Sequence, residues 1–142
     1  MIDISTGDRR KLNVVIAYDS VAAGQRAMHS LSFLERKIGD GMNVDPRLWG
    51  FEFLEDSGMR DQAEVDGSEA DMLIVSAGGE SDLPATVKSW VTKCLAQRFG
   101  NGAVVALLGT TDNFDRPDSA RFQFLQSAAI EAGIDFFAPQ SS

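Results

Sequence analysis

The sequence has few of the residues on which several protein classes depend. It contains a single cysteine in 142 residues, which excludes an internal disulfide framework and a metal site built from a cysteine cluster. Its longest apolar runs, 72–75 and 103–108, are far shorter than the roughly 18 to 20 residues that span a bilayer. Residues 1–13 have no apolar signal-peptide core. These absences predict a cytoplasmic protein that is not inserted in a membrane.

Basic residues are also scarce, with 13 Lys and Arg against 21 Asp and Glu and a formal net charge of −8. An acidic surface repels the phosphate backbone of nucleic acids, so we expect no nucleic-acid partner. Hydrophobic residues make up 44% and charged residues 24% of the chain, which is typical of a globular protein. Residues 1–142 are expected to form a single domain, with 1–11 and 140–142 as loosely ordered ends.

The chain does contain a regular alternation of strand and helix patterns. Apolar or alternating segments predict five strands, at residues 12–18, 48–54, 72–77, 103–108 and 134–138. Helical spacing of apolar residues predicts four helices, at about 23–38, 59–70, 84–99 and 118–132. Asp56 or Ser57 is expected to cap the second helix, and Gly133 to end the last one. This alternation predicts an α/β fold with a parallel sheet, right-handed crossovers and helices on both faces.

Two strand orders, 2-1-3-4-5 and 3-2-1-4-5, fit this alternation and differ in which strand lies at an edge of the sheet. Segment 48–54 alternates Trp49, Phe51 and Phe53 with small or acidic residues, the pattern of a partly buried edge strand. Segment 72–77 is apolar on both faces, as a central parallel strand is. The patterns therefore favour the order 2-1-3-4-5.

In this order, a helix after the fifth strand normally shares one face of the sheet with the first helix. The sequence ends too soon after 134–138 to supply that helix. Apolar side chains of the last strands would then meet water, and a large exposed apolar area usually marks an interface. We expect a homodimer through this face, or else cover by the N-terminal residues. Phe33 and Phe124, placed opposite the inward stripes of their helices, either add to an interface or are isolated surface aromatics.

Ligands of open α/β sheets bind beyond the carboxyl ends of the strands, where the strand order reverses. Here that point lies between the first and third predicted strands. The candidate ligand-binding residues around it are Ser20, Gly24, Gln25, Arg26, Gly78, Gly79, Asp112, Asn113 and Phe114. Such a set could hold a phosphate at a helix N-terminus, and Phe114 could contact a planar ring.

The first of these loops resembles that of a known family. Residues 14–25, VVIAYDSVAAGQ, are similar to the opening of the flavodoxin-like superfamily, in which a strand runs into a hydroxyl-rich loop around the FMN phosphate. Segments 83–88 and 104–114 are similar to a proline-started helix and a second flavin-side loop of that superfamily. The resemblance implies a bacterial protein with a three-layer α/β sandwich, a five-stranded parallel sheet in the flavodoxin-like order 2-1-3-4-5, here lacking the C-terminal helix, and FMN as cofactor.

The phosphate loop is nevertheless degraded. Val21, Ala22 and Ala23 stand where hydroxyls and a glycine are expected, and Arg26 could restore part of the positive charge. Two functions stay open, and neither needs catalytic side chains. The first, which we favour, is a non-catalytic small-ligand or protein-binding scaffold domain. The second is an FMN-binding electron carrier or NAD(P)H-dependent reductase, in which the flavin carries the chemistry.

Other nucleotide and phosphate chemistries lack their residues. A phosphorylation receiver needs an acidic cluster after the first strand and an acceptor aspartate after the third, where this chain has Asp19 alone and Ser76. The glycine-rich fingerprints of dinucleotide-binding proteins and P-loop enzymes do not occur. Glu55 and Asp56 are therefore expected to be helix-capping charges rather than ribose ligands.

Nucleophilic and metal chemistry are also disfavoured. His29 falls on the outward side of its helix, whereas Cys94 falls on an inward stripe and is expected to be a core residue. The loop carboxylates that could bind a divalent cation are Glu80, Asp82, Asp112 and Asp115. No spacing rule selects a metal from them, and we expect no metal site.

Overall fold

The computed structural model describes residues 10–38, 42–79, 81–97, 102–110 and 113–139. Its strands are β2 (Arg10–Tyr18), β3 (Met42–Gly50), β4 (Met72–Ala77), β5 (Ala103–Thr110), β6 (Asn113–Phe114) and β7 (Asp135–Phe137). Its helices are α2 (Val21–Ile38), α3 (Ser57–Ser68), α4 (Ala85–Ala96) and α5 (Ala120–Ala132), with a 3-10 helix η1 (Phe51–Glu55). The predicted α/β alternation is confirmed.

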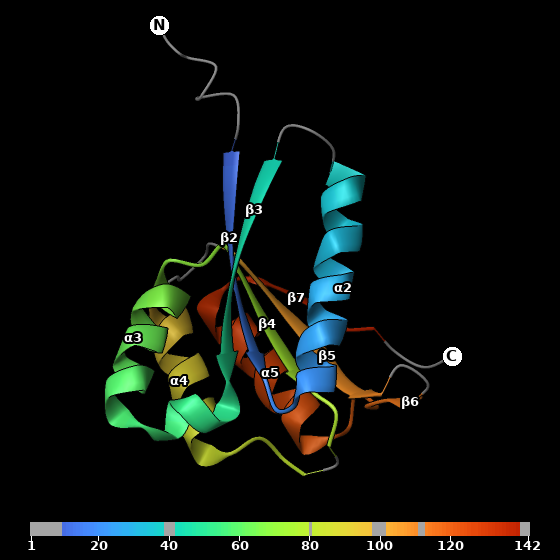
Figure 1. The fold of residues 1–142 in the computed structure, drawn as a ribbon. Helices are drawn as coiled ribbons and strands as arrows, with labels where there is room; N and C mark the ends of the chain where they lie inside the picture. The colour runs from blue at the N-terminus through green and yellow to red at the C-terminus, as the bar shows by residue number, and fades with distance from the viewer. Residues whose placement is uncertain (1–9, 39–41, 80, 98–101, 111–112, 140–142) are drawn as a thin grey trace, which may run out of the picture.

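The sheet has the predicted strand order, with β3, β2, β4 and β5 side by side and β7 beyond the first half of β5 (Figure 1). These pairings are all parallel, whereas the short β6 pairs antiparallel with the end of β5. Ile16 of β2 lies between Leu48 of β3 and Ile74 of β4, so β2 is interior and β3 is an edge strand. The order 2-1-3-4-5 is confirmed.

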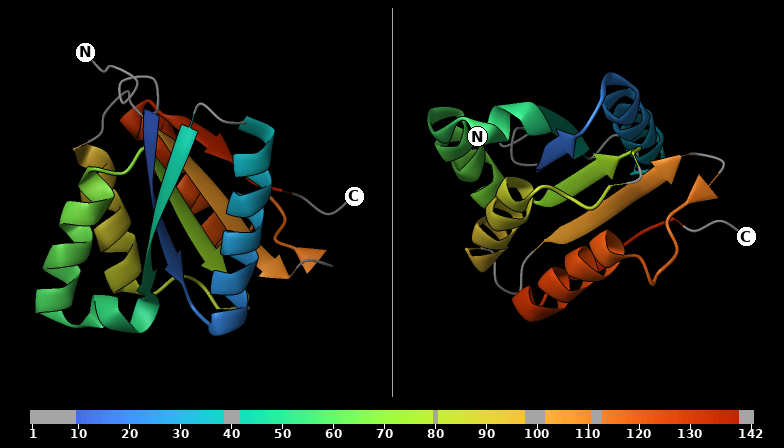
Figure 2. Two further views of the ribbon diagram at one scale, coloured as in Figure 1. Left: turned by 45° about the horizontal axis from the view of Figure 1, so that its top comes forward. Right: turned by 90° about the horizontal axis from the view of Figure 1, so that it is seen from below.

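The described helices cover the two faces of this sheet unequally. Helices α3, α4 and α5 lie on one face, and α2 lies on the other (Figure 2). Val15, Val75 and Val104 join the core on the α3 to α5 side. Ile16 and Ile74 belong to the smaller core beneath α2, because successive side chains of a strand point to opposite faces. Of the described helices, α2 alone lies on the second face.

The second strand differs from its predicted position at 48–54. Strand β3 ends at Gly50, and the aromatic stretch that follows forms η1. The helical turn brings Leu54 into the core, fully buried, while Phe53 remains 42% exposed. Pairing extends instead backwards through Pro46, which an edge strand tolerates because its outer side needs no N–H donor. The prediction of an edge strand is confirmed, and its boundaries were wrong.

Two of the helix ends predicted from capping residues are confirmed. The Asp56 carboxylate accepts a hydrogen bond from the Met59 N–H at 2.9 Å and caps α3. Gly133 ends α5 in the left-handed conformation, at φ 71°. Glu55 was also expected to be a capping charge, but its carboxylate accepts a hydrogen bond from the Thr86 hydroxyl on α4. Within the part of the chain described here, no helix has the length and apolarity needed to cross a bilayer.

The two outward aromatics differ in their surroundings. Phe33 on α2 is 53% exposed, as its position opposite the inward stripe predicts. Phe124 on α5 instead packs partly against the core of the α3 to α5 side, and the Lys88 ammonium lies 5.5 Å from its ring centroid. Only the first of them therefore adds apolar surface near α2.

Candidate functional site

The carboxyl ends of β2, β4 and β5 form one edge of the sheet, which we call the carboxyl edge. The predicted site residues in the loops and helix starts at this edge are Ser20, Gly24, Gln25, Arg26, Gly78, Gly79, Asn113 and Phe114. Asp112 lies outside the described residues. The contacts of these residues decide how much of the carboxyl edge is open to a ligand.

Asp19 occupies two backbone donors of the loop after β4. Its Oδ1 accepts a hydrogen bond from the Gly78 N–H, and its Oδ2 accepts one from the Gly79 N–H, both at 3.1 Å. Its own N–H donates to the Ser76 carbonyl at 3.2 Å. The loops after β2 and β4 are thus joined by a carboxylate of the chain itself, at the point where the sequence predicts a ligand.

The first predicted loop is committed to local structure. Ser20 Oγ accepts a hydrogen bond from the Ala23 N–H at 3.2 Å and so caps α2. Gly24 packs against Tyr18, since a Cβ at Gly24 would lie 3.3 Å from that ring. Gln25 lines an open groove of about 440 Å³ on the β3 side of α2. The serine and the glycine therefore have structural reasons to be present.

Arg26 connects α2 to the ends of two strands. Its Nη1 donates to the Gly109 carbonyl, and its Nη2 donates to the Leu107 carbonyl at 2.8 Å and to Ser76 Oγ at 3.3 Å. Ser76 is fully buried and donates its hydroxyl to the Ala23 carbonyl at 2.8 Å. The guanidinium that the sequence suggested as a phosphate partner is turned inward onto carbonyl groups.

The surroundings of Arg26 also cover the aromatic ring proposed for a flavin. Arg26 Cζ lies 5.7 Å from the centroid of Phe114, a cation–π distance. Burial lowers the pKa of Arg26, and the nearby Asp19 carboxylate opposes this effect. An arginine stays protonated in proteins even so. A positive charge therefore lies against the Phe114 ring, which is predicted to contact a planar ligand.

A buried ion pair closes the neighbouring part of the edge. Arg121 is 5% exposed, and its Nε and Nη2 donate to the two carboxylate oxygens of Asp115 at 2.7 and 2.8 Å. Its Nη1 donates to the Ser81 carbonyl at 3.0 Å, and the Ser119 hydroxyl donates to Asp115 at 2.8 Å. The hydrogen bond from Arg121 lowers the pKa of Asp115, and the same bond raises the pKa of Arg121. The sequence patterns do not identify Arg121. The one feature in the sequence that indicates its burial is its position next to Phe122, which faces the core.

The carboxylates considered for a cation are found in other contacts. Asp115 belongs to the ion pair with Arg121, and Asp82 accepts a hydrogen bond from Lys88 at 2.6 Å. That hydrogen bond is the main cause of a lowered pKa at Asp82. Glu80 and Asp112 lie outside the described residues. Among the residues with described positions, no three His, Cys, Asp or Glu side chains are grouped to hold a metal ion.

Cys94 is placed in the core, as predicted, and burial raises the pKa of its thiol to about 12. Because the thiolate is the reactive form, we expect iodoacetamide to label Cys94 much more slowly in the native protein than in urea. Mass spectrometry of timed samples measures both rates. Equal rates in the two states would contradict the buried position. His29, the other residue considered for nucleophilic chemistry, is exposed on α2, as predicted.

An apolar groove lies on the face that α2 covers, and we call it the α2–β7 groove. Its lining residues are Ser30 and Leu31 of α2, Met72 and Ile74 of β4, Val105 and Leu107 of β5, and Phe137 of β7. It has a volume of about 360 Å³ and is apolar apart from Ser30. Phe137 is 55% exposed at its margin. This groove lies where the sequence predicts incomplete cover of the sheet.

The fold and these two sites define a class of protein: an α/β domain with a mostly parallel sheet in the order 2-1-3-4-5 and an internally bonded carboxyl edge. In comparisons with known proteins, no family model and no curated protein matched the chain. A functional assignment therefore has to come from the geometry of the two sites.

Proposed function

We propose that this chain is a non-catalytic binding domain with a flavodoxin-like, three-layer arrangement, and that it binds through the α2–β7 groove. The observation that supports this proposal is the set of internal contacts at the carboxyl edge. Asp19 occupies the N–H groups of Gly78 and Gly79, and Arg26 is bonded to the ends of β4 and β5. The fold alone would not decide the matter, because function depends on the site.

Binding of FMN at the carboxyl edge would have to disrupt these contacts. A phosphate monoester carries a charge of roughly −2, and at the start of α2, where Ser20, Gly24, Gln25 and Arg26 are predicted to hold it, it would be repelled by the adjoining Asp19 carboxylate. A flavin ring beside Gly78 and Gly79 would meet N–H groups that Asp19 already occupies. A flavin ring stacked on the same face of Phe114 as Arg26 would have to displace the guanidinium. The net charge of −8 adds a general repulsion for an anionic ligand. These costs disfavour the flavin-dependent alternative.

The α2–β7 groove carries no comparable cost. Its lining offers apolar side chains of two central strands, so an occupant displaces water and breaks few hydrogen bonds. Removal of apolar surface from water contributes about 25 cal/mol per Å². Concave, mostly apolar surfaces of roughly 300 to 1,000 Å³ are the usual form of protein binding sites. The groove therefore favours a binding role over a catalytic one.

Titration of the purified protein with FMN tests the carboxyl-edge part of the proposal. We expect no quenching of flavin fluorescence and no rise in Tm. A ligand that binds only the native state adds about 2.7 kcal/mol of stability at a hundredfold excess over its Kd, which a thermal scan detects easily. A yellow protein as purified, or a saturable rise in Tm with FMN, would instead support the electron carrier or reductase and overturn the proposal.

The groove part of the proposal is tested with the neutral dye Nile red at low protein concentration. We expect dye fluorescence to rise with the wild type, to be lost in Val105→Lys on the groove floor, and to persist in Ile130→Lys. Ile130 is a matched control because it is 68% exposed on α5, on the other face. Circular dichroism confirms that both variants are folded. Equal dye binding by the two variants would contradict a binding role for the groove.

A further inference from the structure

We infer that the occupant of the α2–β7 groove is the same groove of a second copy of this chain, an inference that rests on the proposed function. Three observations support it: the shape of the groove face, the position of α2 relative to the sheet, and the distribution of charge. In such a pair, Val105 and Phe137 of each copy would be covered by those of the other.

The groove face has a projection beside a hollow. Phe137 projects from β7 with 55% of its surface exposed, and the hollow next to it measures about 360 Å³. Phe33, three residues after Ser30 on the same side of α2, is 53% exposed. A two-fold interface joins the same patch of both copies, so a patch that has a projection beside a hollow can fit itself. The ring of each Phe137 can therefore enter the groove of the other copy.

The height of α2 restricts how two such faces can meet. A helix with its side chains is about 10 to 12 Å across, and packed sheets lie about 10 Å apart. A second sheet resting on the groove floor would therefore lie beside α2, at the same height. In the single copy, α2 lies over β2, β3 and β4 on the groove face (Figure 2). A two-fold axis across the strands would therefore drive α2 into the second sheet, whereas an axis along the strands would place each α2 beyond the β7 edge of the other copy.

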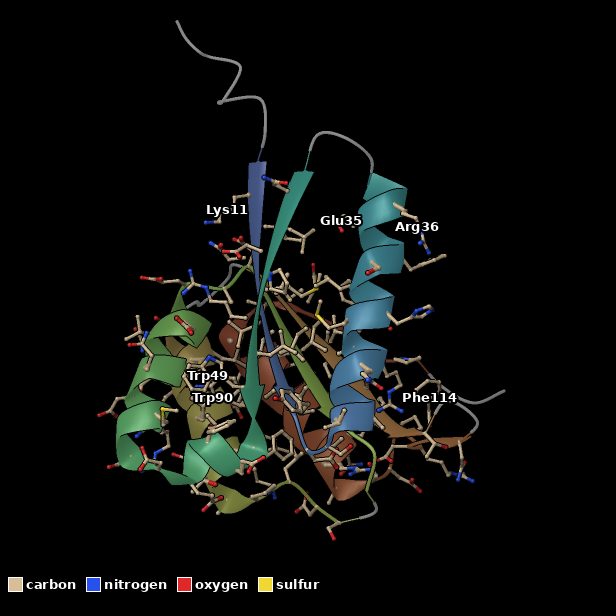
Figure 3. All side chains as sticks on the ribbon, viewed as in Figure 1. Lys11, Glu35, Arg36, Trp49, Trp90 and Phe114 are labelled. Atoms are coloured by element: carbon tan, nitrogen blue, oxygen red, sulfur yellow. The ribbon has the colours of Figure 1, made fainter. Side chains whose placement is uncertain are left out.

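The charges agree with this arrangement. Helix α2 contains three basic residues and one acidic residue, and because Arg26 is bonded inward, the remaining charged residues are Glu35, Arg36 and Lys37 in its last turn. Asp135 is exposed and shares a strand face with Phe137. It pairs with Ala103 at the amino end of β5, and Arg36 lies on α2 at that same end of the sheet (Figure 3). An axis along the strands therefore brings Arg36 of each copy toward Asp135 of the other.

Sedimentation velocity over about a hundredfold range of protein concentration tests the inference, because association follows mass action. We expect the wild type to be a dimer at the upper end of the range. Phe137→Lys is expected to be a monomer throughout, and Ile130→Lys is expected to remain a dimer. Phe137 is already half exposed in the single chain, so its replacement should leave the fold intact, which circular dichroism checks.

A charge variant tests the arrangement itself. Asp135→Lys and Glu131→Lys change the net charge of the chain equally, and both carboxylates are exposed. Only Asp135 lies on the groove face, so we expect Asp135→Lys to weaken dimerisation at least severalfold more than Glu131→Lys. Equal effects of the two substitutions would overturn the proposed axis along the strands.

The outcomes separate this inference from the proposed function. A wild type that stays monomeric but binds Nile red in the groove would overturn the second copy and leave the binding role standing. A dimer that Phe137→Lys does not disrupt would also overturn the inference. If the chain is monomeric and takes up the dye only after deletion of residues 1–9, that segment occupies the groove and the inference fails.

Discussion

Replacement of Asp115 by asparagine is expected to lower the free energy of unfolding by about 3 kcal/mol, because removal of one partner from a buried ion pair leaves the other charge uncompensated. The asparagine oxygen can still accept one hydrogen bond from Arg121, but an amide NH2 replaces the second acceptor and the negative charge is lost, so that the Arg121 charge stays uncompensated. Urea unfolding followed by circular dichroism measures the loss. A change of this size corresponds to a fall in Tm of roughly 10 °C for a domain of this length.

Asp118→Asn is the matched control for this substitution. Asp118 also faces an arginine, Arg116, but at 3.9 Å and with both side chains more than three-quarters exposed. Exposed pairs contribute about 0 to 1 kcal/mol, so this variant should differ little from the wild type. Similar losses in the Asp115 and Asp118 variants would show that the buried pair has no special part in stability.

The difference in stability between the wild type and Asp115→Asn should depend on pH with a definite sign. The pKa of Asp115 is lowered in the native state by the hydrogen bond from Arg121. A carboxylate with a lowered native pKa contributes stability above its ordinary pKa of about 4, and that contribution is lost as the pH falls through the native value. The wild type should therefore have a higher free energy of unfolding than Asp115→Asn by the full amount at neutral pH. This difference should disappear in acid. An advantage that persists in strong acid would exclude the ionised carboxylate as its source.

Gly109→Ala should lower the free energy of unfolding by about 3 kcal/mol as well, through two causes that add. Gly109 has φ +90°, a conformation that costs an L-residue of order 1 to 3 kcal/mol. A Cβ there would lie 2.5 Å from the Asn113 carbonyl oxygen and 3.1 Å from the backbone of Phe114. The pairing of Gly109 with Phe114 would have to loosen, and the Arg26 contact with the Gly109 carbonyl would be disturbed. Thermal unfolding measures the effect.

Gly78→Ala provides the comparison at the same edge of the sheet. Gly78 has an ordinary φ, and a Cβ there would meet the Gly109 carbonyl oxygen at 3.8 Å, a normal contact. Its N–H would still donate to Asp19. We expect a change of less than about 1 kcal/mol, within the range of ordinary surface substitutions. A Gly78 variant as unstable as the Gly109 variant would contradict the argument from backbone conformation.

The order of the sheet could be predicted because burial leaves its pattern in the strands. Segment 72–77 is apolar on both faces, and the structure places it as β4 between β2 and β5. The aromatic alternation at 48–54 indicates an edge correctly, but residues 51–54 lie in η1 and not in the strand. The 3-10 helix at these residues buries the Leu54 side chain in the core and leaves Phe53 partly exposed.

The interior of the candidate site could not be predicted in the same way. Arg26 and Gly109 are 83 residues apart, and Arg121 and Ser81 are 40 apart, so no local spacing marks either contact. A side-chain hydrogen bond of this kind depends on how the helices rest on the sheet. The sequence indicated that Arg26 lies beside the carboxyl ends of the strands, but its direction, toward carbonyl groups, needed the structure.

Pro46 has a consequence for how copies of this protein can aggregate. It lies within the edge strand β3, flanked by the charged residues Asp45 and Arg47. An edge strand with a full row of amide groups is a template for further strands, and repeated addition builds fibres. A proline supplies no N–H to such a row, and the adjoining charges resist dehydration. Growth by strand addition is thereby obstructed along one margin of the sheet, so the molecule is protected there against open-ended polymers.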